Sequence, residues 1–163
     1  MSEELVDIVD DDDNVIATVT RSEMRAGRLQ HRSVGIAVIA SDGRLLIHRR
    51  SETKDIWPGW WDIAAGGVVA SGESYDEAAR RELAEELGIS DTPVQFLGSA
   101  HYVDEDVAAI CRGYRVVKDG PFMLADGEVA ETRWVTFDEL DTMRSTHRFL
   151  PDSMALLLPL IRP

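Results

Sequence analysis

The sequence predicts an α/β fold, because strand patterns stand on both sides of a sharply bounded helix. The helix covers residues 75–87, and strand patterns precede it from residue 5 and follow it to residue 135. The chain has 163 residues, of which 44% are apolar and 29% charged, as in an ordinary globular domain with a sizeable core. We therefore expect one domain over residues 1–163.

The first 29 residues predict a small hairpin followed by a helix. Residues 5–9 and 15–20 are rich in strand-forming residues, and the acidic run between them is typical of a turn. Thr20 and Glu23 form the capping-box pattern of a helix over residues 20–29. Such a hairpin could be the surface of a homodimer or could cap the core of its own chain, and capping is favoured.

The next segments predict the strands of the main sheet. Residues 33–40 are apolar on both faces, which indicates a strand buried inside a sheet. Asp42-Gly43 predicts a tight turn, after which residues 44–48 return as the partner strand. Two further strands are expected at residues 94–102 and 107–117.

The C-terminal part predicts a loop, a strand and short helices. Residues 118–127 contain two glycines and a proline, which indicates an irregular, mobile loop that could close over a substrate. Residues 128–135 predict the last strand, and Thr136 begins a short helix. We expect Asp152 to be the N-cap of a final helix over residues 153–158, ended by the proline that follows.

Strong signals bound the helix over residues 75–87. Ser74 and Glu77 form a capping box, and Gly88 supplies the left-handed position that commonly ends a helix. The 3.6-residue period of a helix predicts one buried apolar stripe, made of Ala79, Leu83 and Leu87.

Three acidic residues, Glu82, Glu85 and Glu86, fall on one face beside that stripe. Like charges at this spacing repel each other, and Arg81 relieves only part of the repulsion. Convergent carboxylates suit a hard divalent cation, most naturally magnesium, with manganese as the alternative ion. The competing interpretation is a solvated acidic helix face.

Residues 67–89 resemble the Nudix box of the Nudix hydrolase family. The resemblance rests on residues that match the family pattern at its spacing, namely Gly67, Glu73, Arg81-Glu82-Leu83, Glu85-Glu86 and Gly88-Ile89. It implies an α/β/α sandwich with a mixed β-sheet flanked by helices. It also implies divalent-metal-dependent cleavage of a diphosphate linkage.

The same resemblance implies roles for individual residues. The implied metal ligands are the carbonyl of Gly67 and the carboxylates of Glu82, Glu85 and Glu86. Either Glu85 or Glu86 is the implied general base, and Arg81 is implied to orient Glu85. Nudix enzymes often take an extra ligand or base from a loop near the last strand, which makes Glu128 a candidate.

A group of basic residues at the end of the strand over residues 44–48 could hold substrate phosphates, since arginine forks match phosphate geometry. The candidate substrate-binding residues are Arg49, Arg50 and Lys54, and we assign His48 and Arg44 to the same basic group. The alternative is a solvated strand end that balances nearby acids.

Two other clusters also have two interpretations. Trp57, Trp60 and Trp61 surround a turn, where they could stack a nucleobase or serve as large apolar anchors. Asp104 and Asp106 could approach the metal site or simply form a polar hairpin loop.

Further residues are similar to the branch of the family that includes isopentenyl-diphosphate isomerase. They are His31-Arg32, Arg49-Arg50, Trp57-Pro58-Gly59-x-Trp61-Asp62 and Ser71-Gly72-Glu73-Ser74. The isomerases carry a catalytic Cys-Gly-His just before the box, where this chain has Ala65-Gly66-Gly67. Because the thiol and the imidazole are both missing, we expect a hydrolase rather than an isomerase.

Charge and composition restrict the kinds of partner and the cellular location that we expect for this protein. A net charge of −13 argues against sequence-independent nucleic-acid binding and against adsorption to anionic membranes. Cys111 is the only cysteine, so no intrachain disulfide can form, which suits a reducing cytoplasm. The sequence shows neither a signal-peptide pattern nor an apolar run long enough to span a membrane.

The leading hypothesis is therefore a divalent-metal-dependent hydrolase of a nucleoside diphosphate derivative or a related organic diphosphate. Two rival hypotheses are an enzyme that isomerises prenyl diphosphates and a non-catalytic module that senses a nucleotide.

Overall fold

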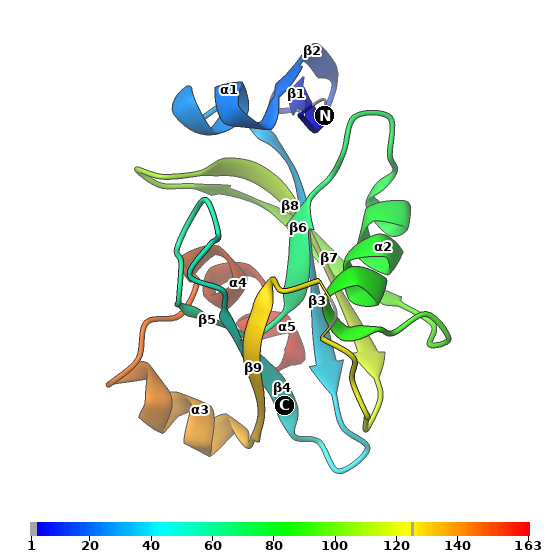
Figure 1. Ribbon diagram of the computed structural model, residues 1–163, viewed down its shortest axis with the longest axis vertical. Coiled ribbons are helices and arrows are strands. Elements are labelled where there is room, and N and C mark those ends of the chain that lie inside the picture. Colours follow the sequence, from blue (N-terminus) through cyan, green and yellow to red (C-terminus); the bar gives the residue numbers. More distant parts are fainter. Residues whose placement is uncertain (1–2, 125) are drawn as a thin grey trace.

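The computed structural model describes residues 3–124 and 126–163. Its strands are β1 (Leu5–Val9), β2 (Val15–Thr20), β3 (His31–Ile39), β4 (Leu45–Arg50), β5 (Trp61–Asp62), β6 (Ala65–Val68), β7 (Gln95–Val103), β8 (Ala108–Val117) and β9 (Val129–Val135). Its helices are α1 (Arg21–Ala26), α2 (Tyr75–Leu87), α3 (Phe137–Arg144), α4 (Pro151–Leu156) and α5 (Leu158–Ile161). Figure 1 shows their arrangement.

β3 is the central strand of a mixed sheet. It pairs in parallel with β8 along its whole length, from His31 opposite Ala109 to Ile39 opposite Val117. On its other side it pairs antiparallel with β6, and it also contacts β1 and β4 near its two ends. The prediction of a strand buried inside a sheet is confirmed, although the strand begins at His31.

Helices cover both faces of this sheet, which confirms the α/β/α sandwich. On one face, α2 packs its apolar stripe against residues of β3 and β8 such as Ile36 and Tyr114. On the other face, α3 and α5 pack against residues of β3 and β4 such as Ala37 and Ile47. Figure 1 places α2 on one side of the central strands and α3, α4 and α5 on the other.

The N-terminal hairpin is also confirmed, since β1 and β2 pair antiparallel. The capping box at Thr20 and Glu23 is present, but α1 ends at Ala26, before the expected end of the helix. Val6, Ile8 and Met24 form a cluster with Val68 of β6. This unit therefore packs on the core of its own chain, as the capping interpretation expected.

The secondary structure differs from its prediction at two further places. The short strand β6 was not predicted: its residues Ala65–Val68 extend into the start of the box and pair with β3. Asp152 is not an N-cap: α4 begins at Pro151, and no side chain caps it. Proline is favoured in the first turn of a helix, because the amide hydrogen that it lacks would have no partner there.

The C-terminal proline was also misinterpreted as a helix stop. Pro159 lies in the first turn of α5, so it follows the start of a second short helix rather than ending the first.

The segment after β8 is free of strand and helix over residues 118–124, as expected, and Met123 N donates to Leu87 O over 3.0 Å. Residue 125 of that loop lies outside the described residues. Among the helices described, none is long and apolar enough to cross a membrane.

Leu157, between α4 and α5, offers a test of the core under the sheet. It is 1% exposed, and a Cβ on Gly35 would lie 3.0 Å from its Cδ1, while one on Gly113 would lie 2.6 Å from its Cδ2. Leu157→Ala is expected to lower the free energy of unfolding by about 3 to 5 kcal/mol, because it empties a site that two glycines leave open. Urea unfolding measures this loss.

The matched control is Leu160→Ala, whose side chain is 42% exposed. It is expected to cost less than about 1 kcal/mol. Equal losses in the two variants would contradict the assignment of Leu157 to the core.

Candidate metal and diphosphate site

The site starts at two glycines of β6. Gly66 and Gly67 pair with Gly35 and Val34 of β3. A Cβ on Gly66 would collide with the carbonyl oxygen of Val34, and one on Gly67 would collide with the carboxylate of Glu82, both at less than 3.0 Å. Glycine is therefore needed at Gly67 so that the Glu82 carboxylate can lie directly against the backbone of β6.

Helix α2 carries the acids as its sequence predicted. Ser74 and Glu77 form the capping box, and Gly88 adopts the left-handed conformation with φ of 68°. The predicted stripe of Ala79, Leu83 and Leu87 is fully buried. This burial fixes which way the neighbouring face of the helix points.

The row of three acids divides into two buried side chains and one exposed one. Glu82 is 6% exposed and Glu86 is 2% exposed, so neither belongs to a solvated helix face. The side chain of Glu85 is 48% exposed. Burying two carboxylates on one helix is costly unless a cation or hydrogen bonds compensate them.

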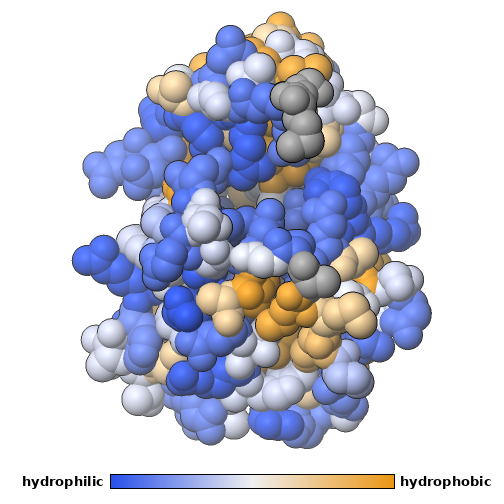
Figure 2. Space-filling model, in the orientation of Figure 1, coloured by the Kyte–Doolittle hydropathy of each residue, from blue (hydrophilic) through white to orange (hydrophobic). Residues whose placement is uncertain are grey.

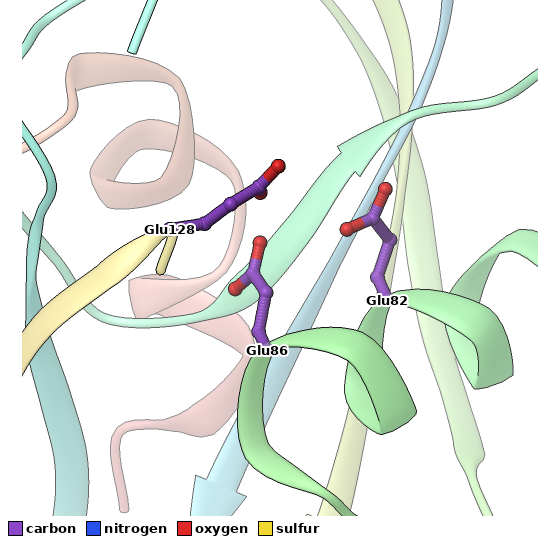
Figure 3. A group of neighbouring side chains, drawn as sticks. All are labelled: Glu82, Glu86 and Glu128. Atoms are coloured by element: carbon purple, nitrogen blue, oxygen red, sulfur yellow. The ribbon is translucent and has the colours of Figure 1, made fainter. Parts of the chain in front are cut away.

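A third carboxylate reaches the same place from the residue that precedes β9. Glu82, Glu86 and Glu128 each have a carboxylate oxygen within 4.8 Å of those of the other two. Figure 3 shows the three side chains converging from α2 and from the start of β9. We call these three residues the carboxylate trio. It contains Glu128, the candidate extra ligand, and not Glu85.

The charge of the trio is only partly compensated, by ion pairs of Glu82 with Arg81 and of Glu128 with Lys54. Oε2 of Glu86 is buried without a hydrogen-bond partner. Burial, together with Glu82 and other nearby acids, raises the pKa of Glu86 well above its usual range. Burial also raises the pKa of Glu82 to about 7, against the lowering effect of Arg81. An all-oxygen donor set with an unpaired buried oxygen fits a hard divalent cation.

Arg81 fastens the loop before α2 to the trio. Its Nε and Nη2 donate to the two carboxylate oxygens of Glu73 over 2.7 and 2.9 Å. Its Nη1 donates to Glu82 over 2.9 Å and to Glu85 over 3.2 Å, and its Nη2 reaches the Val68 carbonyl over 3.2 Å. Arg81 therefore holds Glu82 as well as Glu85, the residue it was expected to orient.

The three candidate substrate-binding residues lie in different surroundings. Lys54 is 15% exposed, and its Nζ lies 2.7 Å from Oε2 of Glu128. Arg50 is buried, with Nη2 donating to the Ile56 carbonyl over 3.0 Å and Nε without a partner. Arg49 is ion-paired with Glu131 over 2.9 Å.

The other two members of the basic group were assigned wrongly. His48 is buried, and burial with the nearby Arg50 lowers its pKa to about 3, so the imidazole is neutral. Arg44 lies at the other end of β4, where its Nε pairs with Asp42 over 2.8 Å. Neither adds positive charge beside Lys54.

Two hollows meet at β6. The first encloses about 600 Å³, partly open to solvent, and its lining includes Arg50, Trp57 and Asp62. The second measures about 870 Å³, including space open to solvent, and is lined by Arg81, Glu82, Glu85 and Glu128, among others. Arg21, Lys54, Gly66 and Gly67 line both hollows. The face of the molecule drawn in Figure 2 is mostly hydrophilic, with a hydrophobic patch in its lower half.

The tryptophans are mainly apolar anchors, because Trp57 and Trp61 are 9% and 5% exposed. Trp57 nevertheless lines the first hollow and stacks on Trp60, with 6.1 Å between ring centroids. Asp104 forms the polar hairpin loop of the alternative interpretation, because its carboxylate accepts bonds from the amides of Asp106 and Val107.

Sequence reasoning missed four charged residues that line the first hollow: Arg21, Arg25, Asp62 and Asp152. Arg21 and Arg25 lie four residues apart on α1, and their Nε atoms share one oxygen of Asp55 over 2.9 and 3.3 Å. The sequence signal that could have found Arg21 and Arg25 is a pair of arginines on one helix face in an acidic N-terminal segment.

Replacing Glu86 by glutamine should stabilise the protein when divalent cations are absent. The variant removes a buried carboxylate whose Oε2 has no partner, which is expected to raise the free energy of unfolding by about 1 to 3 kcal/mol. Because the pKa of Glu86 is higher in the folded state than in the unfolded chain, folding opposes its ionisation. The gain should therefore increase as the pH rises above 4.5, the ordinary pKa of a glutamate.

Urea unfolding in the presence of a chelator checks this expectation. Glu85→Gln is the matched control, since Glu85 is largely exposed and the change should alter stability by less than about 1 kcal/mol. A destabilised Glu86→Gln variant at high pH would show that the trio is already compensated.

Comparisons with known proteins show the family of this chain. Residues 29–155 match the family model of the NUDIX domain. A Yersinia pestis protein described as an uncharacterized Nudix hydrolase is 44% identical over 154 residues, which cover 94% of this chain and 84% of that protein. Nudix hydrolase YfcD of Escherichia coli K12, also described as uncharacterized, is 42% identical over 156 residues, covering 96% and 86%.

Solved structures share the fold. The crystal structure of DR0079 from Deinococcus radiodurans superimposes with a TM-score of 0.84 and 27% identity, covering 98% of this chain and 100% of that one. The NUDIX domain of Shewanella oneidensis NrtR, solved in complex with ADP ribose, gives a TM-score of 0.64 at 16% identity over 85% and 95% of the chains, which supports the fold alone. With its domain match, its relatives and its box in place, this chain belongs to the Nudix hydrolase family.

Proposed function

We propose that the protein is a divalent-cation-dependent hydrolase that cleaves the diphosphate linkage of a nucleoside diphosphate derivative or a related organic diphosphate. The observation that carries the proposal is the carboxylate trio, with its unpaired buried oxygen on Glu86, at the edge of a hollow also lined by Arg81 and Lys54. Structural acids are normally exposed or paired, and Glu86 is neither.

The residues that would hold the ion are Glu82, Glu86 and Glu128, with the carbonyl of Gly67 as a further donor. Magnesium suits an all-oxygen set, and manganese is the usual substitute. A bound ion would neutralise diphosphate oxygens and lower the pKa of a water molecule. Arg81 keeps Glu82 aimed at this place through the 2.9 Å bond from its Nη1.

Glu85 is the carboxylate best situated to accept a proton from the attacking water. It lines the second hollow, lies outside the trio, and is held by Arg81. A carboxylate that is not itself a metal ligand keeps a lone pair for the proton. We therefore assign general-base function to Glu85 and ligand function to Glu86.

The substrate's phosphates would meet Lys54 and Arg50, which line the first hollow. Arg50 retains an unpartnered Nε, and an arginine fork matches phosphate oxygens. Arg49 lines neither hollow, so it is the weakest of the three candidates. Trp57 offers an aromatic wall for a nucleobase in the first hollow.

The isomerase alternative is disfavoured by the position of the one thiol. Cys111 is buried, lies 2.8 Å from Ser33 Oγ, and has a pKa raised to about 12 by burial. It lines neither of the two hollows at β6. The position before the box where an isomerase carries its thiol is Ala65.

A magnesium-supplemented panel of nucleoside diphosphates, nucleotide sugars, dinucleotides, phosphoribosyl pyrophosphate and prenyl diphosphates tests the proposal by phosphate or nucleotide release. Glu86→Gln and Glu128→Gln are each expected to lower kcat at least about 100-fold, since each removes a ligand. Glu131→Gln is the control, because Glu131 is exposed and outside the trio. Undiminished turnover in both trio variants would refute the metal site, and binding without turnover would favour a sensor.

The assignment of the base has its own test. Glu85→Gln should lower kcat by about 10² to 10⁴ while leaving Mn²⁺ affinity within about twofold, because a base is lost but no ligand. If Mn²⁺ affinity instead falls as far as in Glu86→Gln, Glu85 is a ligand and the two roles must be exchanged. Titration calorimetry gives the affinity and steady-state kinetics give kcat.

A further inference from the structure

Lys54 forms an ion pair with the trio that the proposed hydrolysis does not explain. It stands in the segment between β4 and β5, and its Nζ lies 2.7 Å from Oε2 of Glu128. Among the described residues, only Lys54 and Arg81 are ion-paired with members of the trio, and Arg81 contacts Glu82.

An ammonium group is an incomplete substitute for a divalent cation. It carries a single charge and reaches one oxygen of Glu128, while Oε2 of Glu86 is left without a partner. A divalent ion needs oxygens from several carboxylates at once. The ion and the ammonium therefore compete for Glu128, and their positive charges also repel each other.

The side chain of Lys54 has space to move into when a cation displaces it from Glu128. Its side chain lines both hollows, together with Gly66 and Gly67, which carry no side chain that could block its movement. Lysine is a compact charge on a flexible stem of four carbons, so its head can move without a change in the backbone. The diphosphate of a substrate bound beside the trio would offer the displaced ammonium an anionic partner in these hollows.

We propose that Lys54 is a built-in competitor of the divalent cation at Glu128, and that the ion, once bound, frees the ammonium to bind the substrate's diphosphate. The inference rests on the proposed function, because it takes the trio to be the cation site. It makes cation binding and diphosphate binding favour each other through a single side chain. It also assigns an order, with the cation binding before the diphosphate.

The first experiment measures Mn²⁺ affinity without any substrate, by titration calorimetry. Lys54→Met should bind Mn²⁺ about tenfold more tightly than the wild type, because the competitor is gone. Lys118→Met is the matched control: it removes the same charge from the only other lysine of the chain, which pairs with Asp91 on the surface. An unchanged or weaker affinity in Lys54→Met would overturn the proposal.

A double-mutant cycle separates competition from a general charge effect. In a Glu128→Gln background the lysine has lost its partner, so Lys54→Met should tighten Mn²⁺ binding much less than it does in the wild type, because only the repulsion between the two positive charges is left to remove. If the tightening is undiminished in that background, Lys54 acts only through space and does not compete for Glu128. That outcome also overturns the proposal.

The second experiment follows the lysine itself. Because the chain has two lysines, an NMR spectrum of ¹³Cε-labelled lysine contains two signals, which Lys118→Met assigns. Mg²⁺ alone should shift the Lys54 signal and leave that of Lys118 in place. A Lys54 signal that stays fixed while Mg²⁺ saturates the site would contradict the release of the ammonium.

The third experiment tests the coupling with methylenediphosphonate, a diphosphate analogue that cannot be hydrolysed. Mg²⁺ should raise its affinity at least about tenfold more in the wild type than in Lys54→Met. Equal enhancement in the two proteins would overturn the second half of the proposal.

These results separate this inference from the proposed function. If Glu86→Gln and Glu128→Gln abolish turnover but Lys54→Met leaves Mn²⁺ affinity unchanged, only the role of Lys54 fails. If the wild type binds no divalent cation, both fail.

Discussion

The main physical constraint on this structure is that it buries carboxylates beside one another although they repel each other. Glu82 and Glu86 are almost fully removed from solvent, Glu128 joins them, and one buried oxygen of Glu86 has no partner. Such an arrangement costs free energy, so the surrounding structure must hold it in place. The caps of α2 and the glycines of β6 are part of the structure that holds the carboxylates together.

Three features supply the support. The apolar stripe of α2 anchors the helix on β3 and β8, which directs the adjacent acids towards β6. Gly66 lets β6 lie close to β3, and Gly67 leaves room for the Glu82 carboxylate. Arg81 then ties the loop at Glu73 to that carboxylate. The same residues therefore stabilise the local fold and position the carboxylates of the site.

Whether a basic side chain of this protein is charged depends on its burial and on its partners. His48 counts as basic in the sequence, yet burial lowers its pKa to about 3 and keeps it neutral, whereas Lys54 is ion-paired with Glu128 over 2.7 Å. Arg21 and Arg25 come from α1, which precedes the residues matched by the NUDIX family model, and they line the same hollow as Lys54. The N-terminal unit therefore contributes to the walls of the site as well as to the core.

The sequence alone determined the features that depend on local periodicity. These are α2 with its caps, its buried stripe, the hairpin of β1 and β2, and the buried strand β3, because each is specified by neighbours a few residues apart. The box at residues 67–89 identified the family for the same reason.

Only the tertiary structure decided which acids act together. Helical spacing fixes the angle between Glu82, Glu85 and Glu86, but burial depends on what packs against each, and the fold buries Glu82 and Glu86 while it leaves Glu85 exposed. Glu128 and Lys54 meet because β9 pairs with β4, which brings together segments remote in sequence. Pairing of distant strands is not written in any single stretch of the chain, so the trio and its lysine could be seen only in the folded protein.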